Sequence, residues 1–260
     1  CQPWWLREKS SSSCGMTNAI TGAVMTDYRS FPIAQGYLPT SLSDWDQQLA
    51  QVVFLPGCNF RCPFCHNAGI VRGEGEAFAW DDIDAAMTRH QGWVHATVIT
   101  GGEPTIYDGV APLCRWLRIR GHRIKLDTNG ARPDRLRDLL ALRLLDYVAM
   151  DIKTGWSRYA QATGGIAAAA AVRESVAVLR DSGIPFELRT TVVPGLVDAA
   201  ALAELVPDLT GAPAWYLQAY RPAPTLDPAW SELTPPLTAE LHALAAQLRA
   251  AGLPVALRNQ

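Results

Sequence analysis

The stretch Cys58-Asn-Phe-Arg-Cys62-Pro-Phe-Cys65-His66-Asn67 decides how this chain is organised, because it places three of the six cysteines within eight residues. It follows an apolar run at residues 52–55 that predicts a buried strand, and Pro56-Gly57 ends that strand. The cysteines are therefore expected on a loop at the carboxyl end of a strand. Three thiolates on one short loop can converge on one soft metal centre.

The residues of this loop allow several kinds of centre. Zinc needs a fourth ligand, which His66 could supply. The run Cys62-Pro-Phe-Cys65-His66 also matches the pattern for covalent haem attachment, and a simple set of redox thiols is a further interpretation. A four-iron four-sulfur cluster normally takes four cysteines. With three, one iron stays open for a substrate or a cofactor.

The bulk properties exclude some classes of function. The chain has 260 residues, enough for one large α/β domain. A net charge of −2 and a pI of about 6.2 give no support for nucleic-acid binding by overall charge. No apolar run approaches the length that spans a bilayer. The other cysteines, Cys1, Cys14 and Cys114, show no paired framework, so we expect a cytoplasmic protein with neither a membrane nor a nucleic acid as partner.

Residues 1–30 predict a flexible extension outside the fold, because they contain a serine run at 10–13 and no sustained apolar period. This extension need not be native, and Met16 or Met25 is the expected start. A lipid-modified Cys1 is the alternative, and an oxygen-sensitive cluster argues against it. A single domain is then expected over residues 31–260.

Strand and helix patterns alternate along that domain. Residues 36–45 are expected to be an irregular lead-in, and residues 255–257 an additional edge strand. Short strands joined by crossover helices predict a parallel sheet, and six such units are too few for a closed eight-stranded barrel. We therefore predict an α/β fold, a partial (β/α)6 TIM-like barrel with its ligands at the carboxyl ends of the strands. The six principal strands are expected near residues 51–55, 96–100, 123–127, 146–151, 186–193 and 214–218, and helices near residues 81–90, 109–120, 133–143, 167–183 and 198–208. A final helix is expected to carry Leu241, Leu244 and Leu248 on one stripe and to end at Gly252.

Polar residues stand at several of these strand ends. Gly101 and Gly102 leave the backbone open to close approach by a ligand, and the carboxylate of Glu103 could meet an ammonium group. Asp127 and Asp151 end the next two strands, where a turn or helix cap is the simpler interpretation. Two of the three lysines also lie at or beside strand ends, at positions 125 and 153, against twenty arginines in the chain. A flexible ammonium group suits a ligand carboxylate.

The cysteine spacing, with Phe64 before the last cysteine, resembles the signature of the radical S-adenosylmethionine (SAM) superfamily. Together with Thr100-Gly-Gly-Glu-Pro104 and residues 125–130, 149–153 and 189–195, it makes residues 36–221 similar to the glycyl-radical-enzyme activating proteins. The chain most closely resembles the anaerobic ribonucleoside-triphosphate reductase activating proteins, and it is similar to pyruvate formate-lyase activase. The resemblance implies the partial barrel of the radical SAM type.

The resemblance also implies the cofactors and partners. One 4Fe-4S cluster would be held by Cys58, Cys62 and Cys65. An electron from a flavodoxin or ferredoxin-type donor would drive cleavage of SAM to methionine and a 5′-deoxyadenosyl radical. That radical would remove a hydrogen from a glycine of a glycyl-radical enzyme under anaerobic conditions, here the anaerobic (class III) ribonucleotide reductase. The SAM contacts implied are Phe64 and the backbone near His66 by the adenine, Gly101, Gly102, Glu103 and Asp127 by the methionine ammonium, Asp151 by the ribose, and Lys153 by the methionine carboxylate.

Two departures from those relatives matter. Residues 218–221 stand where pyruvate formate-lyase activase has a SAM-contacting histidine, and the eight-cysteine insert of some activases is missing, so a single cluster is expected. Arg189, residues 218–221 and the proline-rich passage 222–236 are expected to form the rim of a peptide-binding opening. Two other functions remain open: a radical SAM enzyme that acts on a small molecule, and a zinc-binding structural domain.

Overall fold

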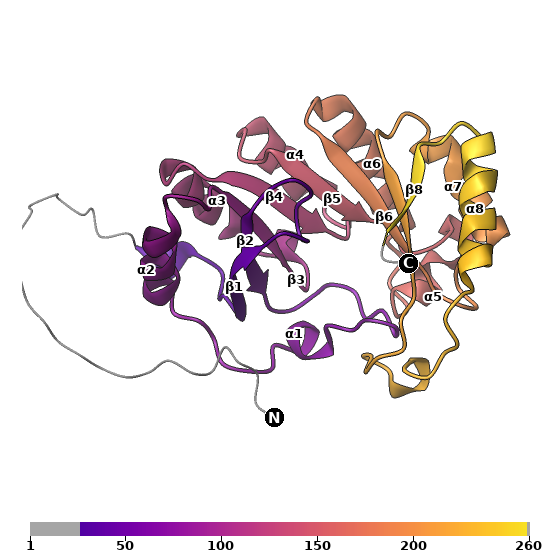
Figure 1. Cartoon of the computed structure of the whole chain (residues 1–260), viewed down its shortest axis with the longest axis horizontal. Coiled ribbons are helices and arrows are strands. Elements are labelled where there is room, and N and C mark those ends of the chain that lie inside the picture. Colours follow the sequence, from indigo (N-terminus) through magenta and orange to yellow (C-terminus); the bar gives the residue numbers. More distant parts are fainter. Residues whose placement is uncertain (1–26, 259–260) are drawn as a thin grey trace, which may run out of the picture.

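The structure, a computed structural model, describes residues 27–258 as one curved eight-stranded sheet with helices packed on its outer face (Figure 1). The strands follow one another in chain order, β1 to β8. Only β1 is antiparallel to its neighbour, and every other pair is parallel. The predicted α/β partial barrel is confirmed. The strands are β1 (Gly36–Ser41), β2 (Ala50–Leu55), β3 (Ala96–Gly101), β4 (Arg123–Thr128), β5 (Tyr147–Asp151), β6 (Phe186–Val192), β7 (Trp215–Ala219) and β8 (Val255–Arg258).

The helices pack apolar faces against the sheet. In α6, Val172, Val176 and Leu179 are fully buried, as a stripe of apolar residues at helical spacing predicts. Gly183 ends this helix with φ of 75°, a left-handed conformation that glycine adopts without strain. The α-helices are α1 (Ala68–Arg72), α2 (Trp80–His90), α3 (Val110–Ile119), α4 (Pro133–Ala141), α5 (Tyr159–Ala162), α6 (Ala169–Ser182), α7 (Ala199–Leu209) and α8 (Thr238–Ala250).

The six predicted strands correspond to β2 through β7, and two further strands flank them. The expected edge strand at residues 255–257 is β8, which pairs in parallel with β7. The prediction that residues 36–45 are irregular is wrong for β1, which pairs with β2 from Gly36 opposite Phe54 to Ser41 opposite Ala50. The sequence did not predict this strand because it contains Pro39, and proline is uncommon within strands. Proline is tolerated mainly at a sheet edge, which is where β1 lies.

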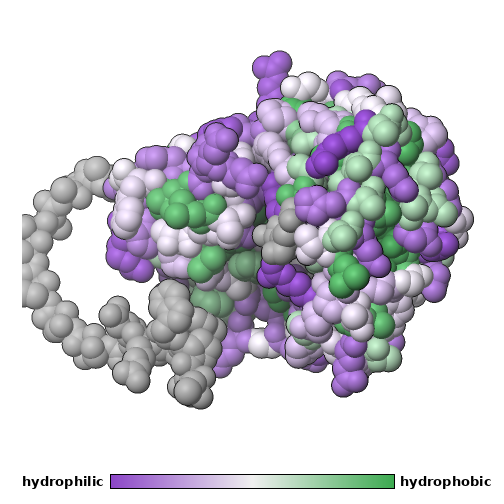
Figure 2. Space-filling model, turned by 45° about the vertical axis from the view of Figure 1, so that its right-hand side comes forward, coloured by the Kyte–Doolittle hydropathy of each residue, from purple (hydrophilic) through white to green (hydrophobic). Residues whose placement is uncertain are grey.

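The ordered fold begins before the predicted boundary at residue 31. Tyr28 donates a hydrogen bond to Oδ2 of Asp84 over 2.7 Å, and its ring packs edge-on against Trp116. The predictions for residues 1–26 lie outside the described residues. Between residues 27 and 258, no helix has the length and apolar character needed to cross a membrane. The surface in Figure 2 is mixed, with hydrophilic side chains interspersed among small apolar groups.

The sheet does not close on itself. β1 and β8 form its two ends and are not paired with each other, so the barrel is open on that side (Figure 1). The carboxyl ends of β2 to β7 converge at one edge, where the cysteine loop also lies. This arrangement creates the cavity described next.

Candidate functional site

A cavity of about 630 Å³ lies at the carboxyl ends of the parallel strands. All three cysteines of the loop line it, and so do most of the strand-end residues that the sequence singled out. The predicted residues on its wall are Cys58, Cys62, Phe64, Cys65, Gly101, Gly102, Asp127, Asp151 and Lys153. Two predicted SAM contacts, His66 and Glu103, are not among the lining residues.

The cysteine loop is fixed by hydrogen bonds from its own backbone N–H groups and by a side-chain hydrogen bond from the residue that follows β4. The N–H of Phe60 donates to Sγ of Cys58 over 3.3 Å, and the N–H of Cys65 donates to the carbonyl of Cys62 over 3.1 Å. Asn129, which follows β4, donates to Oδ1 of Asn59 over 2.8 Å. Burial raises the pKa of the Cys62 thiol to about 12 and also raises that of Cys58.

These residues fit an iron–sulfur cluster better than zinc. Three soft sulfur donors face one cavity, and no carboxylate of the loop joins them. His66, the predicted fourth zinc ligand, lies outside the cavity: Nε2 bonds to the carbonyl of Arg221 at 2.9 Å, and its ring stacks on Tyr220.

The proline-rich passage packs against the outside of the same loop. The N–H of Leu226 donates to the carbonyl of Cys65 over 2.9 Å, and the N–H of Asp227 donates to that of Pro63 over 3.0 Å. The ring of Trp230 lies 6.3 Å from that of Phe64. The passage that the sequence assigned to a substrate rim therefore also supports the cysteine loop.

The two glycines after β3 pack against the start of the cysteine loop. The N–H of Gly102 donates to the carbonyl of Leu55, and a Cβ on Gly101 would lie 2.2 Å from that oxygen. A Cβ on Gly102 would lie only 1.7 Å from the carbonyl oxygen of Gly57. Glycine is therefore required here by backbone packing as well as by any ligand.

Glu103 is directed away from the cavity. Its side chain is fully buried, and its carboxylate accepts hydrogen bonds from the backbone and hydroxyl of Thr105, the hydroxyl of Thr128 and the backbone of Asn129. Burial raises its pKa, and these hydrogen bonds act in the opposite direction. The carboxylate thus ties the end of β3 to the end of β4, and its contact with an ammonium group stays a prediction.

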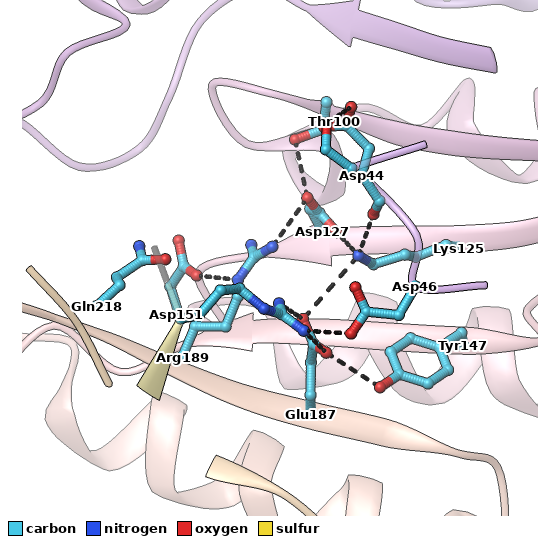
Figure 3. Close-up of polar contacts among 12 residues, drawn as sticks. Asp44, Asp46, Thr100, Lys125, Asp127, Tyr147, Asp151, Glu187, Arg189 and Gln218 are labelled. Carbon is cyan, nitrogen blue, oxygen red and sulfur yellow. Dashed lines mark hydrogen bonds and ion pairs between the residues drawn. The ribbon is translucent and has the colours of Figure 1, made fainter. Parts of the chain in front are cut away.

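Opposite charges on β4, β5, β6 and β8, together with Lys153 after β5 and Asp46 between β1 and β2, form one continuous series, which we call the ion-pair chain and which Figure 3 shows in part. Each interior member contacts two partners of opposite sign. At its centre, Arg189 donates to Asp151 over 2.8 Å and to Asp127 over 3.2 Å. Burial raises the pKa of Asp151, but the charges of Arg189 and Lys153 prevail and hold that pKa well below its ordinary value. In order, the chain runs Lys153, Asp151, Arg189, Asp127, Lys125, Glu187, Arg258 and Asp46.

The sequence interpretation missed the last three members of the ion-pair chain, Glu187, Arg258 and Asp46. Glu187 is buried, accepts a hydrogen bond from Tyr147 over 3.1 Å and pairs with Arg258 at 2.8 Å. Arg258 also reaches Asp46, in the connection between β1 and β2, at 2.7 Å. One signal was available: Glu187 and Arg189 are two residues apart on β6, so both point to the same face of that strand.

Comparison with known proteins agrees with this geometry. Residues 52–206 match the family model described as the Radical SAM superfamily. A protein of Methanocaldococcus jannaschii carries the provisional name glycyl-radical enzyme activating enzyme. It is 28% identical to this chain over 221 residues, which cover 82% of this chain and 90% of that protein. A 7-carboxy-7-deazaguanine synthase of Hyperthermus butylicus is 29% identical over 59% of this chain and 72% of its own length.

Solved structures share the fold at low sequence identity. QueE from Escherichia coli superposes with a TM-score of 0.51 at 18% identity, covering 88% of this chain and 94% of its own. Streptococcus suis SuiB bound to the precursor peptide SuiA gives a TM-score of 0.59 at 15% identity, and the match spans 80% of this chain but only 48% of SuiB. Fold, cysteine loop and family match agree, and the chain belongs to the radical SAM superfamily as a radical SAM enzyme.

Proposed function

We propose that this protein is an activase that removes one hydrogen atom from the Cα of a glycine in a partner glycyl-radical enzyme, the anaerobic class III ribonucleotide reductase. The observation that carries the proposal is the similarity to the M. jannaschii protein over nearly the whole of both chains. The assignment of the ribonucleotide reductase as partner rests on the sequence segments at 100–104, 125–130, 149–153 and 189–195.

Cys58, Cys62 and Cys65 would hold the 4Fe-4S cluster, which together with SAM supplies reductive cleavage and hydrogen abstraction. The protein's own contribution is to orient and shield these groups. The N–H of Phe60 already donates to Sγ of Cys58, and such a bond stabilises a thiolate. Leu226 and Asp227 fix the outside of the loop, which holds its sulfur atoms toward the cavity.

The first four members of the ion-pair chain, from Lys153 to Asp127, offer groups suited to an amino acid moiety. Asp127 Oδ1 is buried and accepts no hydrogen bond from any described residue, and its one cation, Lys125, lies 3.5 Å away. Such an oxygen is ready to accept an ammonium N–H. Lys153 ends the chain with Asp151 as its only anionic partner among the described residues, so it could pair with a carboxylate. Arg189 would keep Asp127 and Asp151 in place.

One of the predicted SAM contacts, Glu103, takes a different part in this proposal. The backbone of Gly101 and Gly102 borders the cavity, whereas Glu103 would support the site from behind by joining β3 to β4. The exposed His66 would act through its backbone alone, because its ring is engaged by Tyr220 and Arg221.

The direct test uses the reconstituted protein and a class III ribonucleotide reductase under oxygen-free, reducing conditions. We expect a carbon-centred radical on the reductase by electron paramagnetic resonance, and transfer of deuterium from its labelled glycine into 5′-deoxyadenosine. If neither is seen with any glycyl-radical enzyme encoded near this protein, the activase proposal fails.

The second candidate is a radical SAM enzyme that acts on a small molecule. The similarity to the H. butylicus 7-carboxy-7-deazaguanine synthase favours it, although that match covers 59% of this chain against 82% for the activase relative. Substrate-dependent 5′-deoxyadenosine formation distinguishes the two candidates. A deazaguanine-like metabolite that stimulates it, with no response to the protein partner, would replace the activase proposal.

A further inference from the structure

We infer that Arg258 anchors an acidic side chain of the substrate, and that Asp46 occupies its place until the substrate enters. This inference rests on the proposed peptide substrate and names a feature that the substrate must carry. Arg258 is the last described residue of β8, and its side chain lies across the open side of the barrel. The cavity that holds the three cysteines extends to both Arg258 and Asp46.

The two acidic partners of Arg258 differ in how firmly they are held. Glu187 is only 3% exposed, receives both terminal nitrogens of Arg258 at 2.8 and 3.2 Å, and is bound by Tyr147 as well. Asp46 is 60% exposed, and Arg258 is its only side-chain partner among the described residues. An ion pair with an exposed partner contributes little free energy. Asp46 is therefore the partner that a ligand can displace.

The position of Arg258 is fixed even without Asp46. Its guanidinium stacks over the ring of Tyr216, 3.8 Å from the ring centre, and Glu187 holds two of its nitrogens. A guanidinium held in this way presents its remaining N–H groups in a defined direction, which suits a carboxylate. Since those groups now point to Asp46, an incoming acid would meet the same geometry.

Charge balance favours an acid over a neutral group as the replacement. The ion-pair chain contains four carboxylates and four cations, so it is neutral as a whole. Displacement of Asp46 by a neutral amide would leave the guanidinium of Arg258 without its second carboxylate and the series with one positive charge in excess. Displacement by a carboxylate keeps the balance. The two edges of the sheet, joined at present by the Asp46–Arg258 pair, would separate as the peptide enters.

The test measures binding of short fluorescent peptides with a central glycine to the cluster-loaded protein with SAM, without oxygen. Each peptide is made in two forms that differ only by Glu or Gln at one flanking position, and the position is varied. For at least one position we expect the Glu form to bind about five-fold more tightly or better, with a preference that weakens as salt rises. Arg258→Gln should abolish the preference, and Asp46→Asn should tighten binding of the Glu form by about three-fold or more because the competitor is gone.

Glu174→Gln is the matched control, since it breaks an exposed ion pair with Arg137 far from the cavity, and it should change neither affinity. Equal affinities for all Glu and Gln forms, or a preference that survives Arg258→Gln, would overturn the inference. The peptide assay needs no radical transfer, so the two proposals can fail separately. A Glu preference without a radical on any partner rejects the activase alone, and a radical formed equally well by Arg258→Gln at limiting partner concentration rejects the anchor alone.

Discussion

Arg189 and Asp151 face each other in register on adjacent strands, and Nε of Arg189 donates to Oδ1 of Asp151 over 2.8 Å. The same guanidinium reaches Asp127 on β4, so one side chain positions two carboxylates of the proposed SAM site. Arg189 on β6 is thereby linked to Asp151 at the end of β5 and to Asp127 near the end of β4. The ion-pair chain is built outward from this link in both directions.

Arg189→Gln should weaken SAM binding by about ten-fold or more, because Asp127 and Asp151 lose the cation that orients them. Cluster content should stay the same, since Arg189 does not contact the cysteine loop. Arg189→Lys should be intermediate, because an ammonium group cannot make the same two-way contact. Titration of the reconstituted variants with SAM measures this, and unchanged affinity in Arg189→Gln would contradict the positioning role.

Lys153→Met should weaken SAM binding by about 1.5–3 kcal/mol, the range for a hydrogen bond to a charged group. The substitution keeps the length of the side chain and removes the ammonium group that faces the cavity beside Asp151. Equilibrium binding under oxygen-free conditions checks the prediction, with iron content as the internal control. Wild-type affinity in this variant would exclude the carboxylate contact.

Substitution of Cys58, Cys62 or Cys65 by Ser should remove most of the iron and all reductive SAM cleavage, since three ligands already leave one iron open. Cys114→Ala is the control. Cys114 is fully buried in α3 and does not line the cavity, so its loss should leave iron, sulfide and cleavage intact. A cluster that disappears with Cys114 and survives loss of Cys65 would refute the ligand assignment.

Gly102→Ala should destabilise the protein by about 2–4 kcal/mol and lower its iron content, because the new Cβ would collide with the carbonyl of Gly57 at the base of the cysteine loop. Chemical denaturation and iron analysis measure the two effects. Gly92→Ala is the control, since a Cβ there meets nothing within 4 Å. Equal losses in both variants would show that the close approach at Gly102 is not the cause.

The free energy of unfolding should fall as the pH drops from about 6.5 toward 4, through His122. Burial lowers the pKa of His122 from 6.5 to about 4, and its Nδ1 lies 2.9 Å from the hydroxyl of Thr97. Between these values the unfolded chain binds a proton that the folded protein excludes, so acid favours unfolding by up to about 3 kcal/mol. Denaturation of the cluster-free protein at a series of pH values should show this loss, and His122→Gln should remove it. His242→Gln, at an exposed site, should not.

Local patterns in the sequence predicted much of the framework. Apolar runs of strand length followed by Gly, Pro or Asp located β2 to β7, and the apolar stripe of α6 located a helix. Such patterns are visible within a few residues, because burial of one face of a helix or strand makes apolar residues recur at the period of that element. These patterns did not predict β1, because Pro39 interrupts its sequence pattern and the segment becomes a strand only by pairing with β2.

The sequence alone also identified the cysteine loop and the strand-end residues Asp127, Asp151 and Lys153 as candidate site residues, because ligands gather where parallel strands end. All of these residues line the cavity. Tertiary structure alone decided which of these side chains reach the cavity. Glu103 follows the same strand-end rule, yet its buried carboxylate is engaged by donors from Thr105, Thr128 and Asn129. Asp46 and Arg258 are 212 residues apart and meet only because the curved sheet brings its two ends together, and local periodicity carries no information about a contact made by closure of the whole sheet.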